Sequence, residues 1–575
     1  MKRYWKYIRP YIQYYILGPC FMMMEVVGDV LLPYMLAKII NQGIAERNVV
    51  YIIKIGVIMG FIAVIMAVGG VLGAWFASKA AMNFGADLRM DLFEKIQQFS
   101  FQNIDNFSTG SLITRLTNDI TQIQNMIMMT LRMCLRSPGI LIGAMVMAFV
   151  ISPKLAAIFI IVLPVLAVLI VVIMRRAFPQ FRTLQEKLDA LNSCIQEGLV
   201  GIRLIKSFVR GDYEEMRFEK RNQQLKEANL TAMKTMLLYT PLMTLALNIT
   251  TVVVVWSGGN MIVAGNMQVG DLTAFTNYIV QIMSSLTMLS IAFLNWARAI
   301  ASFRRVGEVL DEKIDLTDEN AKHKDRAVCE GSVEFQNVSF RYYKNSPEWV
   351  IENISFKLEA GKTLGIIGST GSGKSTLVSM IPRLYDTDEG TVLVDGINVR
   401  DYGLKPLRDG IGMVLQNNTL FSGSITENLK WGDEDADENA VRTAAQNAQA
   451  AGFIDSFKDG YRTRLEQSGN NVSGGQKQRL CIARALLKCP KILILDDSTS
   501  AVDTATERAI REALHSEYKD MTKIIIAQRI RSVMDADEIL VLDNGKTAGF
   551  GTHEQLLADC PVYREIYDVQ NGREE

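Results

Sequence analysis

Apolar residues dominate long stretches in the first half of the chain, and this pattern ends at about Arg305. A helix needs about 20 mostly apolar residues to cross a bilayer. The run LAAIFIIVLPVLAVLIVVIM, from Leu155 to Met174, is the clearest example. Six such stretches predict an all-α, six-helix transmembrane domain within residues 1–310; they lie at about 14–40, 52–80, 127–152, 155–176, 236–264 and 271–297.

The polar joins between these stretches differ in length. Three are short, whereas two, at about 81–126 and 177–235, are long and charged. Lys and Arg collect in the long joins and beside both chain ends, which predicts that both termini are cytosolic. Because a structureless join of this length is uncommon, we expect long helical extensions into the cytosol. A polar break in each predicts a short docking element, near Asn103–Leu112 and Ser207–Met216.

Two carboxylates interrupt the first predicted span. Glu25 and Asp29 are four residues apart and therefore share one face of a helix. Charges within a membrane are costly and often mark functional sites. One interpretation is a polar wall of a transport pathway for cationic cargo. The simpler interpretation, which we favour at this stage, is a water-facing interhelical pair near the outer end of the span.

Beyond the last span the pattern changes to that of a soluble α/β protein. A polar linker is predicted at 311–330, followed by a domain over 331–575 that opens with the alternating strand pattern GSVEFQNVSF. The apolar run TLGII then leads into GSTGSGKS, which matches GxxxxGK[ST] and precedes a helical run. Glycines in such a loop let backbone N–H groups wrap a phosphate at a helix N-terminus. The sequence therefore predicts an α/β P-loop NTPase fold for this domain.

The motif also predicts the ligands of the nucleotide. Lys374 would reach the β- and γ-phosphates, and the Ser375 hydroxyl would bind Mg²⁺. A second apolar strand, KILILD, ends at Asp496, whose carboxylate is the other predicted Mg²⁺ group. The loop residues predicted to contact ATP are Gly368, Ser369, Thr370, Gly371, Ser372, Gly373, Lys374, Ser375 and Thr376.

The composition further narrows the class of protein to which this chain can belong. The chain has 575 residues, too many for one core. Its 61 basic residues balance 61 acidic ones, which argues against nucleic acid as the main partner. Seven Cys are scattered without a CxxC pair, a pattern that suits reduced thiols rather than disulfides or a zinc site.

The stretch VSGGQKQR, from Val472 to Arg479, lies about 100 residues after the phosphate loop and before the Asp496 strand. With this order of motifs, the whole chain resembles an ATP-binding cassette (ABC) exporter half, with six spans fused to one nucleotide-binding domain. The resemblance implies that two cassettes pair head to tail. Each ATP would then lie between one chain's phosphate loop and the other chain's signature residues, which here are Ser473, Gly474, Gly475 and Gln476.

Further roles follow from the same resemblance. Tyr342 would stack on adenine, a role that suits an aromatic face. Gln416 would sense Mg²⁺ and couple the cassette to the membrane part. The residues Ala501–Val502–Asp503 match the loop that crosses the dimer interface.

Two positions depart from the family pattern. The family expects Glu after the strand Asp and His in the next strand's motif, but the chain has Asp497 and Gln528 there. Asp497 withdraws the carboxylate by about 1.5 Å, and a misplacement of about 1 Å can cost on the order of 100-fold in rate. Gln528 can donate a hydrogen bond to a γ-phosphate, but it cannot carry a positive charge or relay a proton. We therefore expect this chain's own site to bind ATP and hydrolyse it slowly; the alternative is neutral drift, with Asp497 still serving as a base.

These observations lead to one preferred function and two alternatives. The preferred function is a subunit of an ATP-driven exporter of the cell membrane that moves hydrophobic or amphipathic compounds, with ATP and Mg²⁺ as cofactors. Because the signature is intact, we expect a heterodimer whose second chain carries the Glu and His missing here. The alternatives are a homodimeric lipid or peptide exporter with slow ATPase activity, and a non-transporting protein gated by ATP. Multidrug export is the expectation for substrate, and it rests on family analogy alone.

Overall fold

The computed structural model describes residues 2–344, 346–498 and 502–571. The chain divides into two compact units. The helical unit comprises Met1–Gln97 and Gly110–Asp311, and the cassette unit comprises Gln98–Thr109 and Glu312–Glu575. The short segment 98–109 therefore belongs with the cassette unit, although it lies between two parts of the helical unit in the sequence.

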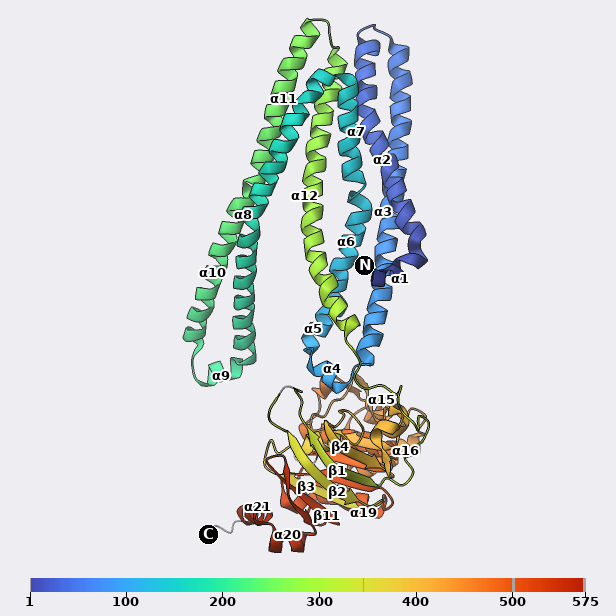
Figure 1. The fold of residues 1–575 in the computed structure, drawn as a ribbon, viewed down its shortest axis with the longest axis vertical. Coiled ribbons are helices and arrows are strands. Elements are labelled where there is room, and N and C mark those ends of the chain that lie inside the picture. The colour runs from blue at the N-terminus through green and yellow to red at the C-terminus, as the bar shows by residue number, and fades with distance from the viewer. Residues whose placement is uncertain (1, 345, 499–501, 572–575) are drawn as a thin grey trace. The chain divides into compact units, whose positions relative to one another are not determined.

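Long helices build the helical unit (Figure 1). Their bounds are α1 (Trp5–Ile8), α2 (Ile12–Lys38), α3 (Val49–Gln97), α5 (Thr109–Thr114), α6 (Ile120–Met133), α7 (Arg136–Ile151), α8 (Pro153–Val200), α9 (Ile202–Ser207), α10 (Gly211–Leu237), α11 (Tyr239–Val263) and α12 (Val269–Asp311). Short 3₁₀ turns η1 (Lys2–Tyr4) and η2 (Arg9–Tyr11) precede α2, and π-helical segments η3 (Ile39–Ile44) and η4 (Arg115–Asp119) extend α2 and α5.

Within the described residues, five helical stretches are long and apolar enough to cross a membrane. They are Trp5–Ile44, Val49–Gln97, Thr109–Ile151, Pro153–Val200 and Gly211–Val263, and each overlaps one of the first five predicted spans. The sixth predicted span, 271–297, lies on α12, where the side chains at 290, 291, 293–295, 297 and 298 are outside the described part. The long joins are helical, as expected, because α3, α8 and α10 continue far beyond their apolar stretches.

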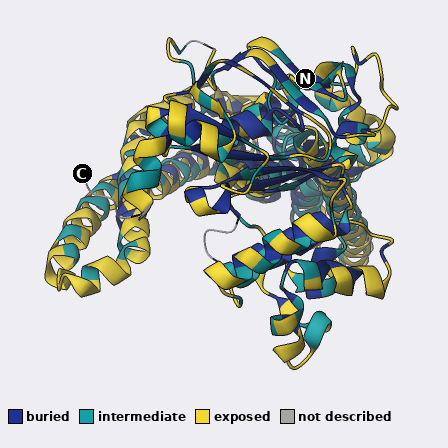
Figure 2. Cartoon of the chain, turned by 90° about the horizontal axis from the view of Figure 1, so that it is seen from below, coloured by how far each residue is buried: buried dark blue, intermediate teal, exposed yellow. Residues whose placement is uncertain are grey.

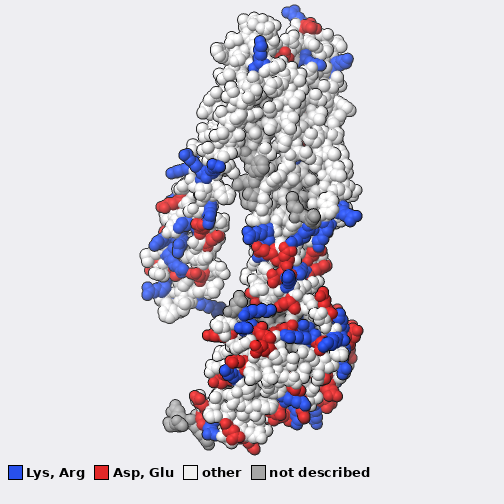
Figure 3. Space-filling view, in the orientation of Figure 1, with Lys and Arg blue, Asp and Glu red and all other residues white. Residues whose placement is uncertain are grey.

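Charged side chains along the helical unit follow the same division into apolar stretches and helical extensions. Figure 3 shows a broad band of this unit that is almost free of charged side chains, below a few Lys, Arg, Asp and Glu at its upper end, whereas charged side chains cover the lower parts of α8 and α10. Small residues let the apolar helices approach closely, as is usual within membranes. A Cβ added to Gly18 of α2 would lie 3.4 Å from the backbone N of Ala77 in α3. Farther along, the Tyr278 hydroxyl of α12 donates to the carbonyl of Val30, at 2.8 Å.

The carboxylates of the first span have a basic partner that the sequence did not reveal. Arg136, at the start of α7, lies 2.8 Å from Glu25 and 3.4 Å from Asp29. The Gln281 amide of α12 donates to the backbone carbonyl of Asp29, at 2.7 Å. Glu25 precedes Ile44, the end of η3, by 19 residues, or about 28 Å of helix. The structure thus adds Arg136 as the partner of the two carboxylates, and their place near the outer end of the span stays a prediction.

Replacement of Arg136 by Ala is expected to destabilise the helical unit, because it leaves two carboxylates without their cationic partner. The loss is expected to be on the order of 2 kcal/mol, below the roughly 3–5 kcal/mol typical of a fully buried pair, since all three side chains are partly exposed. Thermal unfolding of the detergent-solubilised chain measures it. Arg132→Ala, at an exposed position one turn earlier, is the control. Equal melting temperatures for the two variants would show that the ion pairs contribute nothing.

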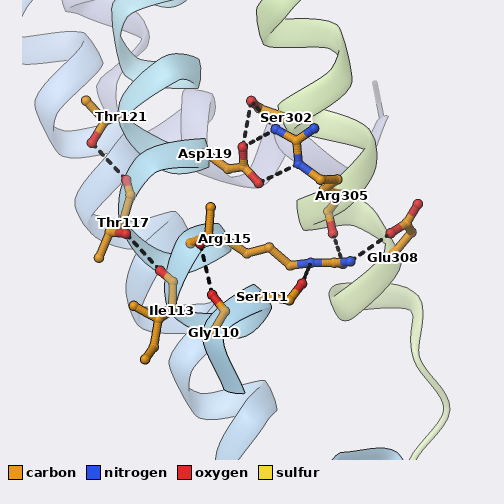
Figure 4. A network of polar contacts seen from close by, with 11 residues as sticks. Gly110, Ser111, Ile113, Arg115, Thr117, Asp119, Thr121, Ser302, Arg305 and Glu308 are labelled. Carbon is orange, nitrogen blue, oxygen red and sulfur yellow. Dashed lines mark hydrogen bonds and ion pairs between the residues drawn. The ribbon is translucent and has the colours of Figure 1, made fainter. Parts of the chain in front are cut away.

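A second polar network joins the end of α12 to η4 (Figure 4). The Asp119 carboxylate is 1% exposed and accepts from the Ser302 hydroxyl at 2.9 Å and from Arg305 Nε at 2.8 Å. One turn earlier, Arg115 lies 3.1 Å from Glu308 and donates to the carbonyl of Arg305. These contacts fix the last turns of α12 against η4, within the first long join.

The cassette unit is built on a mostly parallel sheet. Its strand order is β12-β11-β3-β10-β9-β6, and only β12 is antiparallel to its neighbour. A four-stranded antiparallel sheet, ordered β2-β1-β4-β5, packs its apolar side chains into the same core. In Figure 2 the strands are largely buried, and the helices around them present exposed faces to solvent.

The strands and helices of this unit have the following bounds. The strands are β1 (Val333–Phe340), β2 (Ile351–Leu358), β3 (Thr363–Gly368), β4 (Glu389–Val394), β5 (Ile397–Asn398), β6 (Ile411–Val414), β7 (Gly423–Ser424), β8 (Arg464–Leu465), β9 (Ile492–Asp496), β10 (Thr522–Ile526), β11 (Glu538–Asp543) and β12 (Lys546–Gly551). The helices are α4 (Phe101–Asp105), α13 (Lys374–Ser379), α14 (Leu404–Asp409), α15 (Ile425–Leu429), α16 (Glu438–Asn447), α17 (Ala451–Ser456), α18 (Gly474–Leu487), α19 (Thr504–Ser516), α20 (His553–Asp559) and α21 (Pro561–Asn571).

The first predicted docking element is confirmed as part of the cassette unit. A capping box between Ser100 and Asn103 starts α4, and the Asn103 amide donates to the carbonyl of Lys313 at 2.9 Å. Asp105, at the other end of α4, accepts from the Tyr385 hydroxyl at 2.9 Å. The second element, around α9, stays a prediction; its neighbours Phe208 and Val209 are 70% and 87% exposed.

Candidate nucleotide-binding site

The predicted site residues follow the carboxyl ends of three adjacent strands. The central order β3-β10-β9 places the phosphate loop, Gln528 and the Asp496–Asp497 pair side by side. Ile526 of β10 pairs with Asp496 of β9, and with Ile366 of β3 on its other side. Ligands of open α/β sheets bind at this edge.

The phosphate loop needs glycine at specific points. Gly371 and Gly373 have φ of 86° and 90°, in the left-handed region that glycine adopts without strain. A Cβ on Gly373 would also lie 2.9 Å from the carbonyl oxygen of Val350. The loop can therefore turn sharply into α13 and leave its N–H groups available to a phosphate.

Side chains that are suited to bind Mg²⁺ and phosphate lie close together beside this loop. The Ser375 hydroxyl donates to the Asp496 carboxylate at 2.9 Å, and Asp496 is 3% exposed. Burial raises the pKa of Asp496, whereas the hydrogen bond from Ser375 lowers it. Lys374 Nζ donates to the carbonyls of Gly368 and Ser369, at 2.9 and 2.7 Å. Burial lowers its pKa, against the opposing effect of Asp497 and Asp496.

These groups line one cavity of about 310 Å³. Its walls are Tyr342, Val350, Thr370, Gly371, Gly373, Lys374, Ser375, Thr376, Gln416, Asp496, Asp497, Ile526 and Gln528. A serine hydroxyl beside a carboxylate matches the oxygen ligands that Mg²⁺ prefers, and a lysine with the loop N–H groups matches a polyphosphate. The residues therefore fit Mg²⁺ and ATP. No cluster of three His, Cys, Asp or Glu side chains that could hold another metal occurs in the part of the chain that the structure describes.

Tyr342 borders this cavity and is linked to α4 through Tyr385. Its hydroxyl lies 2.8 Å from the Thr376 hydroxyl. Its ring meets Tyr385 edge to face, with 5.3 Å between centroids, and Tyr385 contacts Phe101 and Asp105 of α4. Tyr385 therefore links Tyr342, the residue predicted to stack on adenine, to the docking element α4. The sequence did not predict this link.

The two unusual positions contact each other directly. The Gln528 side-chain amide donates to the Asp497 carboxylate at 2.7 Å. Asp497 has φ of 45°, a conformation that Asp tolerates better than most residues. Burial raises the pKa of Asp497, whereas the Gln528 hydrogen bond and the Lys374 charge lower it. From the sequence, Gln528 is expected to donate to a γ-phosphate; its hydrogen bond to Asp497 was not predicted. The sequence feature that could have indicated this contact is that Asp497 and Gln528 each follow the end of one of two neighbouring strands.

The signature residues take part in a different local structure. Ser473 caps α18 through a capping box, in which Gln476 Oε1 accepts from the Ser473 N–H at 2.9 Å. None of Ser473, Gly474, Gly475 and Gln476 is among the described residues that line the cavity around Lys374. Of the predicted interface loop, Ala501 lies outside the described residues, and Asp503 caps α19.

The chain matches two family models, in the order that its fold shows. Residues 15–286 match the ABC transporter transmembrane region, and residues 351–500 match the ABC transporter model. It is 39% identical over 574 residues to the uncharacterized ABC transporter ATP-binding protein YfiB of Bacillus subtilis, covering 100% of this chain and 99% of that protein. It is 36% identical over 570 residues to the uncharacterized ABC transporter ATP-binding protein Rv1273c of Mycobacterium tuberculosis, covering 98% and 97%. The chain belongs to the ABC transporter family.

A solved structure described as a bacterial Atm1-family ABC exporter with ATP bound matches the fold with a TM-score of 0.81. It covers 98% of each chain at 24% identity. The predicted class is therefore confirmed: one helical membrane domain is fused to one α/β nucleotide-binding domain, as in an ABC exporter half-transporter. Membership in this family implies ATP binding and pairing with a second half.

Proposed function

We propose that this chain is one half of a heterodimeric exporter of the cell membrane, with both termini and the cassette unit in the cytosol. The observation that carries the proposal is the 2.7 Å hydrogen bond between Gln528 and Asp497. This bond engages the carboxylate of Asp497, at the position where the family has the longer side chain of a catalytic Glu. The chain's own site then binds ATP firmly and hydrolyses it slowly.

The roles of the chain's own residues follow from this geometry. Bound Mg²⁺·ATP supplies the phosphoanhydride bond whose cleavage drives the cycle. Lys374 and the loop N–H groups bind its phosphates, while Ser375, Asp496 and Gln416 provide oxygen atoms toward the metal. Asp497 is positioned poorly to take a proton from water, because its side chain is short and Gln528 already donates to it.

Two surfaces support pairing with a second chain. The signature residues lie apart from the chain's own cavity, so they are available to a second chain's phosphate loop. The tip formed by α8, α9 and α10 exposes Val200, Leu204 and Phe208, each at least 63% exposed. Such an apolar tip on a charged hairpin suits burial against another protein. We expect the second chain to carry the Glu and His that this chain lacks.

The proposed substrates are hydrophobic or amphipathic compounds, of the multidrug type. A Bacillus subtilis relative, YgaD, is provisionally named as a multidrug export ATP-binding/permease protein and is 33% identical over 584 residues, covering 99% of each chain. The membrane part also contains runs of Met, such as Met22 to Met24. Flexible, polarizable side chains of this kind adapt to varied apolar ligands.

The test measures ATP binding and phosphate release by the chain purified alone. We expect ATP to bind, and binding to be lost in Lys374→Ala and kept in Lys357→Ala, an exposed lysine of β2. Phosphate release should stay near background in the unmodified chain. A fully active chain that purifies only with copies of itself would instead support the homodimeric alternative.

A further inference from the structure

A second cavity of the cassette unit lies between α19, the segment 531–536 and the strands β3 and β10. It has a volume of about 910 Å³. Thr363 and Lys523, at the amino ends of β3 and β10, pair with each other in the sheet and line its floor. One face of α19 and the segment 531–536, which follows β10, form its walls.

The floor holds a buried lysine. Lys523 is 5% exposed, and its Nζ donates to the carbonyl of Met521 at 2.9 Å. An ammonium group can donate three hydrogen bonds, so a single backbone carbonyl does not use its capacity. Burial lowers the pKa of Lys523, although Asp537 and Asp520 oppose the shift. A buried cation that faces a cavity favours an anionic occupant.

The wall contributed by α19 carries two arginines, one histidine and one carboxylate, that of Glu512. Arg508, Arg511 and His515 lie at helical spacing and line the cavity together. Arg511 Nη1 donates to the carbonyl of Arg531 at 2.7 Å and lies 3.4 Å from Asp535. Its Nε is buried without a hydrogen-bond partner. The Arg511 guanidinium is therefore held by the opposite wall, with one donor still unused.

The charge of the lining is uneven. Three arginines, Arg508, Arg511 and Arg531, and the buried Lys523 line the cavity together with two acidic side chains, Glu512 and Asp535. Arginine forks match phosphate oxygens in pairs, and clustered cations in a concave site concentrate anions. The cavity is also larger than the nucleotide cavity, at about 910 against about 310 Å³.

We propose that this cavity binds a soluble compound with two or more phosphate groups, held by Arg508, Arg511 and Lys523. The site is distinct from the ATP site and does not depend on the function proposed above. One wall, the segment 531–536, begins three residues after Gln528.

The test uses inorganic tripolyphosphate as the probe and the full chain in detergent, by isothermal titration calorimetry. The binding assigned to this cavity should weaken at least 10-fold in Arg508→Gln and further in Arg508→Gln/Arg511→Gln. It should persist in Lys374→Ala, which removes the phosphate-loop lysine, and in Lys357→Gln, the exposed control. Arg508 is exposed, so its replacement should leave the melting temperature unchanged even where Arg511→Gln lowers it.

Two results would overturn the proposal. Loss of all tripolyphosphate binding in Lys374→Ala would place the anion at the ATP site alone. Unchanged affinity in Arg508→Gln, with the chain folded, would show that the basic face of α19 binds no phosphate.

Discussion

Purified alone, the chain with both Asp497→Glu and Gln528→His is expected to hydrolyse ATP on the order of 100-fold faster than the unmodified chain. The longer Glu side chain returns the carboxylate to the position from which it can accept a proton from water. His removes the amide that donates to this carboxylate at 2.7 Å and restores a group that can carry charge. Steady-state phosphate release measures the gain.

The rate gains of the two single substitutions should not add up to the gain of the double variant. With Asp497→Glu alone, Gln528 can still donate to the new carboxylate, so we expect a small increase. Adding Lys374→Ala to the double variant should return the rate to background, and Asp559→Glu, at an exposed position of α20, should leave it unchanged. Full activity of the unmodified chain would show that Asp497 already serves as the base.

In a complex with its second chain, Ser473→Ala is expected to lower ATP turnover by about 100-fold, the range found when one donor to a developing charge is removed. The reason is that Ser473 would serve the second chain's active site. Asp497→Ala, in contrast, should change turnover of the complex less than twofold, because its own site contributes little hydrolysis. The measurement is turnover of the purified complex for each variant.

Ser473 also caps α18, so loss of the cap must be separated from loss of a phosphate contact. Thr552 caps α20 through the same capping-box arrangement, and each cap contributes about 1 kcal/mol. Thr552→Ala should therefore match the stability change of Ser473→Ala without its loss of turnover. An Asp497→Ala complex as inactive as the Ser473→Ala complex would contradict the unequal sites.

Local patterns were sufficient to predict the two-part architecture. Apolar stretches of span length, the GSTGSGKS loop and the KILILD strand each depend on residues that are close in sequence. Lys374, Ser375 and Asp496 line one cavity because the motifs that carry them follow the carboxyl ends of parallel strands in one sheet.

Contacts between distant segments were not predictable in the same way. Arg136 pairs with Glu25 across 111 positions, and Asp119 pairs with Arg305 across 186 positions. Nothing in the local sequence indicates which basic residue will meet a given carboxylate. The grouping of α4 with the cassette unit likewise depends on Tyr385, whose partner Asp105 lies 280 positions away.

In the proposed heterodimer, this chain's site holds ATP while the second chain's site hydrolyses it. Photo-crosslinking of the complex during turnover tests it, with azido-ATP labelled either at the α- or at the γ-phosphate. We predict that this chain retains both labels, whereas the second chain retains only the α label. Loss of the γ label from this chain, at the same rate as from the second one, would contradict the account.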